Sequence, residues 1–236
     1  MTLPKPDMPI FEKTLPSTKA KIKIRPMTTK EEKILLIAKQ GDDPAEILSA
    51  VKQVVGNCLL DDRDVGSLAA FDIEYLYVNI FAVSKTNKVK VSYRDNEDNK
   101  VRDFDVNLSD VEVVFPEEDY RKVVANDKIS LLFKYPEAKI YDDKAFMDLE
   151  GEKVFEELAV RCLDKVYEGD TAFEATTMKP EEIREWLDTL PAVVYDQTRK
   201  LFSNLPTLRY EIKYTNDNNK ERKIVLSTLN DFFTLR

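Results

Sequence analysis

The 236-residue chain contains no histidine, and this limits the chemistry that its side chains can support. Histidine is the side chain whose unperturbed pKa lies near neutrality, and it is the usual base that activates a serine or cysteine nucleophile. It is also the preferred ligand in most zinc and iron sites. The sequence therefore excludes the common catalytic triads, and we predict no catalytic, cofactor-binding or metal-binding residues.

Loops that bind phosphate or calcium are also disfavoured. The chain has five glycines, and they form neither a GxGxxG nor a GxxxxGK pattern. The stretch "DDRDVG" at 61–66 resembles the start of a calcium loop, but Arg63 and Val65 stand where oxygen ligands are needed. A similar pattern from Asp217 fails because Arg222 replaces the glycine of the turn. We interpret the two stretches as an interhelix loop and a hairpin tip.

Adjacent carboxylates, such as Glu31 with Glu32, leave one catalytic alternative open. Carboxylates that hold a divalent metal can hydrolyse a substrate without histidine. However, adjacent pairs are expected among 44 acidic residues, and acidic residues in the first turn of a helix stabilise that helix. A metal-dependent hydrolase therefore ranks behind a non-enzymatic protein.

Composition indicates a soluble globular protein, because 43% of the residues are hydrophobic and 34% are charged. The net charge of −8 disfavours nonspecific binding to nucleic acid. No apolar run approaches the roughly 18 residues that cross a bilayer. Cys58 and Cys162 are expected to be buried thiols. We expect a protein without a membrane span that stays in the cytoplasm or in an assembly built there.

The N-terminal part combines an extended arm, a strand and helices. Four prolines make residues 1–16 an extended arm. Apolar and basic residues alternate over 20–25, which predicts a strand with one buried face and places Lys21, Lys23 and Arg25 together on the other face. Pro26 ends this strand. Helical patterns are then expected from Thr28, from Pro44 with an aspartate cap, and over 72–84.

Strands and helices alternate in the rest of the chain. A period of two predicts a hairpin from Lys88 to Leu108 and another from Leu208 to Leu226. The two hairpins contain the similar stretches "YRDNEDNK" and "YTNDNNK", which indicate either an internal repeat or turns of a common type. Further strands are expected at 111–115 and 129–133, and helical stripes at 155–166, 183–190 and 194–202.

These patterns predict the α+β class, with a helical N-terminal core, small antiparallel hairpins or a small sheet, and a C-terminal module of helices and a hairpin. We divide the chain into an arm at 1–16, a strand, three helices and small sheet at 17–136, and C-terminal helices with the terminal hairpin at 137–236.

Two groups of residues are candidates for contacts with other proteins. The first is the basic strand with its flank, although lysines on a strand edge also deter aggregation. The second is the aromatic pair near the C-terminus, because terminal residues are ordered when they dock on something. Trp186 is assigned to the core. The candidates are Lys21, Lys23, Arg25, Pro26, Phe232 and Phe233.

Several short motifs occur in order along the chain: "LPSTKAKIKIRPMTTKEEKILL", "VKQVVGNCL", "FDIEYLYVNIFAVS" and "LNDFF". Together they resemble the baseplate hub family of T-even-type myophages, which contains hub subunits and hub-assembly chaperones. The resemblance is strongest over 11–84. The matching positions are candidates for the fold or for an interface: Pro16, Ser17, Thr18, Arg25, Pro26, Glu31, Glu32, Asn57, Cys58, Asp72, Glu74 and Tyr75.

The resemblance implies a non-enzymatic protein without cofactors that helps to build the central hub of a contractile tail. Its partners would be other baseplate hub proteins of the same phage. It would work in the host cytoplasm during assembly, either as a transient chaperone or as a part of the virion. A generic structural adaptor is a further alternative, which differs only in its partner.

Overall fold

The computed structural model describes residues 6–41 and 43–232, and it shows the predicted α+β fold. The chain forms two compact units. Unit 1 contains Met1–Val65, Phe71–Val114 and Thr207–Arg236, and unit 2 contains Gly66–Ala70 and Phe115–Pro206. The predicted boundaries at 16 and 136 differ from this division, because the C-terminal hairpin pairs with a strand from the middle of the chain and not with the helices that precede it.

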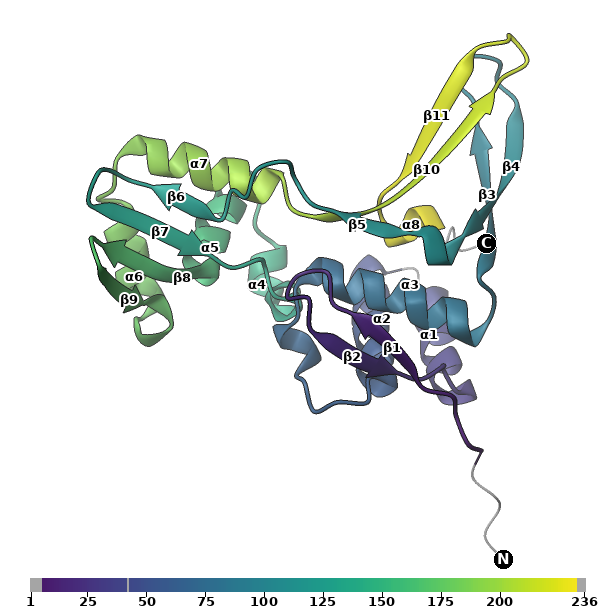
Figure 1. Ribbon diagram of the computed structural model, residues 1–236, viewed down its shortest axis with the longest axis horizontal. Helices are drawn as coiled ribbons and strands as arrows, with labels where there is room; N and C mark the ends of the chain where they lie inside the picture. Colours follow the sequence, from purple (N-terminus) through teal and green to yellow (C-terminus); the bar gives the residue numbers. More distant parts are fainter. Residues whose placement is uncertain (1–5, 42, 233–236) are drawn as a thin grey trace, which may run out of the picture. The chain divides into compact units, whose positions relative to one another are not determined.

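Unit 1 begins with a short antiparallel pair, β1 (Phe11–Thr14) and β2 (Lys21–Ile24) (Figure 1). The alternation in β2 buries Ile22 and Ile24 and exposes the two lysines between them, as a half-buried strand requires. Residues 11–14 belong to the predicted arm, but here they are paired within the chain.

Three helices follow: α1 (Thr29–Gly41), α2 (Pro44–Cys58) and α3 (Ala70–Ser84). The predicted starts are confirmed to within two residues. Asp43 caps α2 by accepting a hydrogen bond from the Ala45 backbone N–H at 2.9 Å. Helix α3 is buried over most of its surface, and its Leu76 and Ile80 are fully buried.

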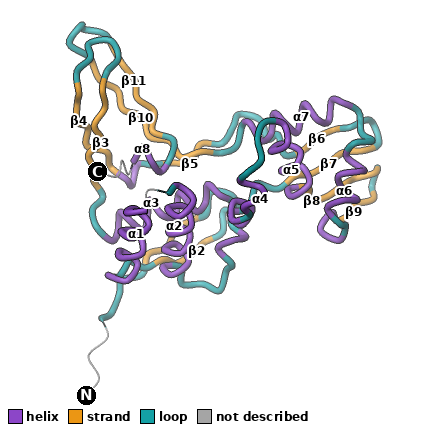
Figure 2. Tube along the Cα trace, turned by 180° about the vertical axis from the view of Figure 1, so that it is seen from behind, coloured by secondary structure: helices purple, strands orange, loops and turns teal. Residues whose placement is uncertain are grey.

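Two hairpins complete unit 1. The first joins β3 (Lys88–Arg94) and β4 (Val101–Asn107), and the second joins β10 (Thr207–Thr215) and β11 (Glu221–Leu226). Strand β5 (Glu112–Val114) pairs with β10. The hairpins lie side by side in both views (Figures 1 and 2). They share one hydrophobic core, to which helix α8 (Leu229–Phe232) and one side of α3 contribute.

Unit 2 is built around an antiparallel sheet in the order β6-β7-β8-β9. Its core joins strand residues such as Leu131 and Phe133 to helix residues such as Leu158 and Leu201. The rings of Phe133 and Phe202 pack edge to face with their centroids 6.1 Å apart. The elements are β6 (Lys122–Val124), β7 (Ile129–Phe133), α4 (Lys144–Met147), α5 (Glu152–Cys162), β8 (Leu163–Glu168), β9 (Thr171–Glu174), α6 (Pro180–Leu187) and α7 (Ala192–Ser203).

One helical prediction in unit 2 is wrong at its C-terminal end. The apolar stripe at 155–166 was interpreted as helical throughout, but α5 ends at Cys162 and the chain continues directly as strand β8. Val166 lies opposite Leu131 of β7 and is buried in the sheet. A residue four positions after Cys162 also fits a helical stripe, so the apolar spacing alone does not distinguish the two structures.

Candidate functional site

The exposed face of β2 is the part of the predicted basic surface that remains open. Lys21 and Lys23 both point to solvent. The Lys21 ammonium forms an ion pair with Glu12 of β1 at 2.7 Å, and both side chains are more than half exposed. Lys23 lies opposite Glu12 in the strand register and forms no ion pair within the described part of the chain. The hydrogen bond and charge of Lys21, with a smaller contribution from Lys23, lower the pKa of Glu12.

Arg25 does not share this face, because β2 ends at Ile24. Its guanidinium turns inward and donates to the Asn57 carbonyl at 2.7 Å and to Glu31 at 3.2 Å. The Glu31 side chain is 3% exposed. Burial raises the pKa of Glu31, but hydrogen bonds from Arg25 and Thr28 outweigh this effect and bring it to about 2. Pro26 is buried as well. Arg25 and Pro26 therefore hold the turn from β2 to α1.

A second buried contact joins the β1–β2 turn to α3. Asp72 is fully buried and accepts hydrogen bonds from the Ser17 backbone N–H, at 3.0 Å, and from the Ser17 hydroxyl. Burial raises the pKa of Asp72, and the bonds from Ser17 lower it. The Cys58 thiol lies 3.7 Å from the Arg25 guanidinium, and burial raises its pKa to about 11. Ser17, Cys58 and Asp72, which belong to the N-terminal motifs, therefore take part in the packing of the fold.

Of the aromatic pair near the C-terminus, the structure describes Phe232. The Phe232 side chain is 2% exposed and lies in the core that the two hairpins share. Asp231 holds the preceding turn by accepting from the backbone N–H groups of Ser227 and Thr228, both at 2.8 Å. Phe233 lies outside the described residues.

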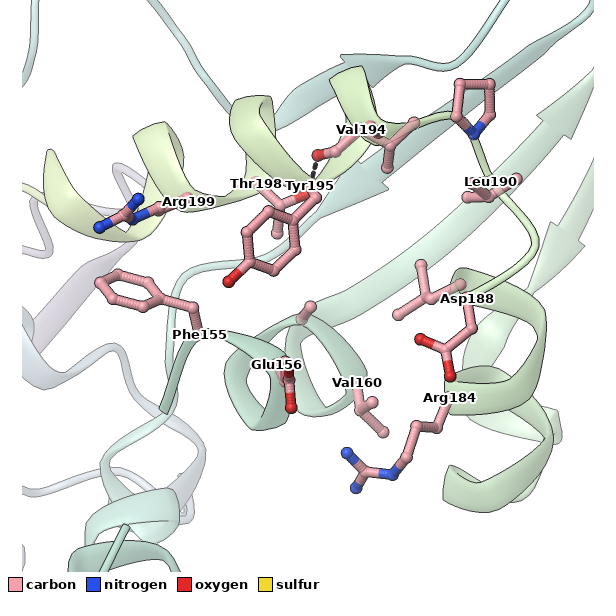
Figure 3. A pocket seen from close by; sticks show the side chains of 14 residues that line it. Phe155, Glu156, Val160, Arg184, Asp188, Leu190, Val194, Tyr195, Thr198 and Arg199 are labelled. Carbon is pink, nitrogen blue, oxygen red and sulfur yellow. Dashed lines mark hydrogen bonds between the residues drawn. The ribbon is translucent and has the colours of Figure 1, made fainter. Parts of the chain in front are cut away.

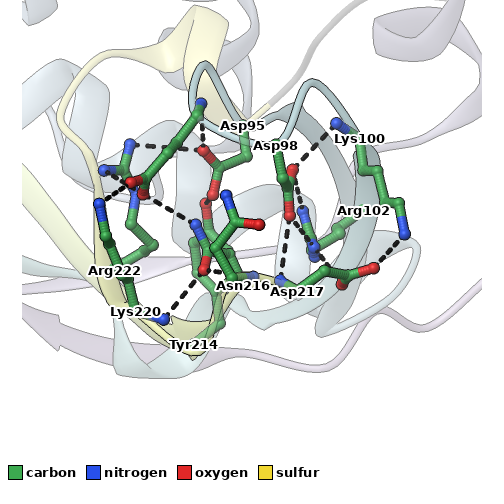
Figure 4. Close-up of polar contacts among 11 residues, drawn as sticks. Asp95, Asp98, Lys100, Arg102, Tyr214, Asn216, Asp217, Lys220 and Arg222 are labelled. Atoms are coloured by element: carbon green, nitrogen blue, oxygen red, sulfur yellow. Dashed lines mark hydrogen bonds and ion pairs between the residues drawn. The ribbon is translucent and has the colours of Figure 1, made fainter.

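The tips of the two hairpins form a charged cluster that the sequence analysis missed (Figure 4). Asp217 in the second tip accepts from Lys100 and, at 2.6 Å, from Arg102 of the first hairpin. Glu97 in the first tip accepts from Lys220 and contacts Arg222 at 3.5 Å. Each hairpin therefore offers one lysine and one arginine to a carboxylate in the turn of the other.

The turns beneath this cluster are alike in their backbone. Asn99 and Asn219 both have positive φ angles, 60° and 55°, a conformation that asparagine tolerates better than most residues. Asp95 and Asn216 each accept a hydrogen bond from the backbone N–H two residues on, at 2.8 and 3.1 Å. The Tyr214 hydroxyl also donates to Asp95 at 2.7 Å. The closing hydrogen bonds differ, because the Asn99 N–H donates to the carbonyl four residues before it and the Asn219 N–H to the carbonyl three residues before it. The features that the turns share are typical of hairpin turns in general, so an internal repeat and turns of a common type both stay open.

Unit 2 contains a pocket of about 340 Å³ between α5, α6 and α7 (Figure 3). Its volume is at the lower end of the range of ligand pockets, roughly 300–1,000 Å³. Helical stripes predict the helices in this region but not a pocket where the helices meet, so the sequence analysis missed it. The apolar lining consists of Phe155, Ala159, Val160, Leu187, Leu190, Pro191, Ala192 and Val194, and the polar lining of Glu156, Arg184, Asp188, Tyr195, Thr198 and Arg199.

The carboxylate pair considered for hydrolysis does not converge on one point. Glu31 faces Arg25 in the interior, whereas Glu32 forms an ion pair with Lys85 at 2.6 Å. Within residues 6–41 and 43–232, no three histidine, cysteine, aspartate or glutamate side chains are grouped so that they could hold a metal ion. None of the helices in these ranges is both long enough and apolar enough to cross a membrane.

Comparison with known proteins identifies the family. No curated protein and no solved structure matches the chain. A family model described as T4 bacteriophage base plate protein matches residues 8–234, which is nearly the whole chain and includes both compact units. The chain therefore belongs to the T4 bacteriophage base plate protein family.

Proposed function

We propose that this phage baseplate protein takes part in building the central hub of a contractile tail, through contacts with other hub proteins and without catalysis. The family match over residues 8–234 carries the proposal. The N-terminal motifs that resemble hub proteins support the hub assignment. The Arg25–Glu31 and Ser17–Asp72 contacts support a role of several motif residues in stabilising the fold.

The exposed lysines of β2 are the proposed contact with an acidic partner. Lys21 and Lys23 lie on one face of a two-stranded sheet, in a chain whose net charge is −8. A positive patch on an acidic protein speeds and orients the approach of an acidic surface more than it raises affinity. Arg25, Pro26 and Phe232 are assigned to the fold, and a contact through Phe233 stays a prediction.

The test is coexpression of the protein with the other hub proteins of its phage, followed by pull-down. The variant Lys21→Gln/Lys23→Gln removes two charges without placing a new carboxylate beside Glu12. Lys88→Gln/Lys90→Gln is the matched control, because these exposed lysines have the same spacing on strand β3 of the same unit. We expect the first variant to recover less hub protein, and to lose more recovery at high salt, than the control.

Equal recovery with both variants would remove the β2 lysines from the interface and leave the hub assignment intact. Failure of the unaltered protein to recover any hub protein would contradict the hub assignment itself. Mass spectrometry of purified virions then distinguishes a structural subunit from a transient assembly chaperone. A structural subunit is present in virions, whereas a transient chaperone is absent from them.

A further inference from the structure

We propose that the pocket between α5, α6 and α7 docks a basic amphipathic segment of a partner protein. A large aliphatic side chain of that segment would fill the pocket, and its flanking lysine or arginine residues would meet the rim. This site lies in unit 2 and requires a partner of opposite charge to the one proposed for the β2 lysines. It therefore goes beyond the proposed hub contact and does not depend on it.

The floor of the pocket is suited to an aliphatic side chain. Ala159, Val160 and Val194 are buried side chains that still line the open space. Leu187 and Leu190 add apolar surface from the end of α6 and the turn that follows. Burial of apolar surface is a main driving force of association, so a leucine that leaves water for this floor would supply much of the affinity of a docked segment.

The charges at the rim decide the chemistry of the partner. The two arginines that line the pocket are already paired: Arg184 donates to Glu157 at 2.6 Å, and Arg199 contacts Glu152 at 3.2 Å. The two lining carboxylates, Glu156 and Asp188, are exposed and form no side-chain hydrogen bond or ion pair within the described part of the chain. The rim therefore presents unpaired negative charge beside an apolar floor.

Glutamates on the neighbouring helix add to the negative charge around the pocket. Helix α6 carries Glu181, Glu182 and Glu185, and its only cation is the paired Arg184. Figure 3 shows Glu156 on α5, Asp188 directly after the end of α6, and Tyr195 on α7. The Tyr195 ring is 40% exposed and offers a flat apolar surface to an incoming segment. An acidic segment would be repelled here, and an uncharged apolar segment would leave the rim carboxylates unused.

The probe is a labelled helical peptide of about 14 residues, or four turns, with leucines at i, i+3, i+4 and i+7 and lysines elsewhere. A second peptide has glutamate in place of each lysine, and a third has alanine in place of each leucine. Binding to the full chain is measured by fluorescence anisotropy at about 0.15 M salt, where the Debye length is about 8 Å. We expect the leucine–lysine peptide to bind more tightly than both others.

Two protein variants locate the binding. Glu156→Gln/Asp188→Asn removes the unpaired rim charges and should weaken binding of the leucine–lysine peptide by about fivefold or more. Glu168→Gln/Asp196→Asn removes the same charge from exposed positions on β8 and α7 that do not line the pocket, and it should leave binding within about twofold of the unaltered protein. Circular dichroism and thermal unfolding verify that both variants are folded.

Three results would overturn the proposal. The first is no binding of the leucine–lysine peptide. The second is equal binding of the leucine–lysine and alanine–lysine peptides, which would indicate adhesion to an acidic surface without use of the pocket. The third is an equal loss of affinity in the two protein variants. Each of these results leaves the hub pull-down unaffected, so failure of this proposal and failure of the proposed function can be told apart.

Discussion

Arg102 of the first hairpin donates a hydrogen bond to Asp217 of the second at 2.6 Å, although the two residues are 115 positions apart in the chain. The reverse contact joins Arg222 of the second hairpin to Glu97 of the first at 3.5 Å. The lysine contacts repeat this exchange. Such reciprocity is the hallmark of two-fold related surfaces, and here it occurs within one chain.

Because each tip pairs with the other, we expect that loss of a carboxylate from one tip destabilises both hairpins. Asp217→Asn and Glu97→Gln each remove the negative charge that pairs with two cations of the opposite hairpin. We expect faster amide hydrogen exchange in both hairpins for either variant, measured on peptides that cover 93–102 and 214–222. Asp105→Asn on the exposed side of β4 is the control. Faster exchange confined to the altered hairpin would show that the tips are independent.

Acid should loosen the tips before it unfolds the hydrophobic core between the hairpins. The pKa of Asp217 is lowered chiefly by Lys100, that of Glu97 by Lys220, and that of Asp95 by the Tyr214 hydroxyl. A carboxylate whose pKa is lower in the folded state stabilises that state above its unfolded pKa of about 4. This contribution is lost as the pH falls through the folded pKa. The ring signals of Tyr214 in NMR spectra should therefore change below about pH 4.

A variant tests whether the ion pairs cause this acid response. Lys100→Gln/Lys220→Gln removes both lysines that lower the carboxylate pKa values. We expect its Tyr214 signals to change at higher pH than those of the unaltered protein. Identical titration curves would show that the lysines do not set the pKa values of the tip.

The buried pair of Arg25 and Glu31 should matter more for stability than an exposed pair one position away. Glu31→Gln leaves the Arg25 charge without its carboxylate in a turn where Glu31 is 3% exposed, and we expect a loss of about 2–4 kcal/mol in the free energy of unfolding. Glu32→Gln removes only the contact with Lys85 and should cost less than about 1 kcal/mol. Denaturant unfolding measures both. Equal losses would contradict an anchoring function for Arg25.

Phe232 should act on stability even when no partner is present. Phe232→Ala opens a cavity in the core of the hairpins, and a loss of about 3 kcal/mol in the free energy of unfolding is expected. Phe173→Ala on β9 is the control, because that ring is 41% exposed. Thermal unfolding of the purified protein compares the two. Unchanged stability in Phe232→Ala, together with weaker binding to hub proteins, would restore this residue to an interface.

Helix caps and apolar patterns predicted the elements whose structure depends on residues close together in the sequence. The aspartates before Pro44 predicted the start of α2, and a short apolar run that stops before Pro136 predicted Ile129–Phe133 as a strand. The alternation at 20–25 was extended one residue too far at Arg25, because the strand ends at Ile24 and the guanidinium reaches back to Asn57. Strand β8 was missed, because its pairing with β7 determines its structure and the apolar spacing alone does not.

Contacts between distant segments were not predictable from these local patterns. The similar tip sequences were visible, but their mutual ion pairs depend on the packing of two hairpins more than 100 positions apart. The pocket of unit 2 arises where three helices meet, and each helical stripe alone resembles an ordinary core face. Periodicity shows which side of a helix is apolar, whereas tertiary packing decides how much of that side is covered.

The pairing of β5 with β10 also bears on how this protein could have evolved. The chain passes into unit 2 after Val114 and returns at Thr207, and these two residues are partners in the strand register. Paired antiparallel residues are about 5 Å apart, so the segment from 115 to 206 starts and finishes at neighbouring points. Mutation can therefore lengthen or shorten this segment while the strands that border it keep their alignment. The part of the segment at 136–138 is constrained separately, because it is hydrogen-bonded to residues 68–70 of the same unit.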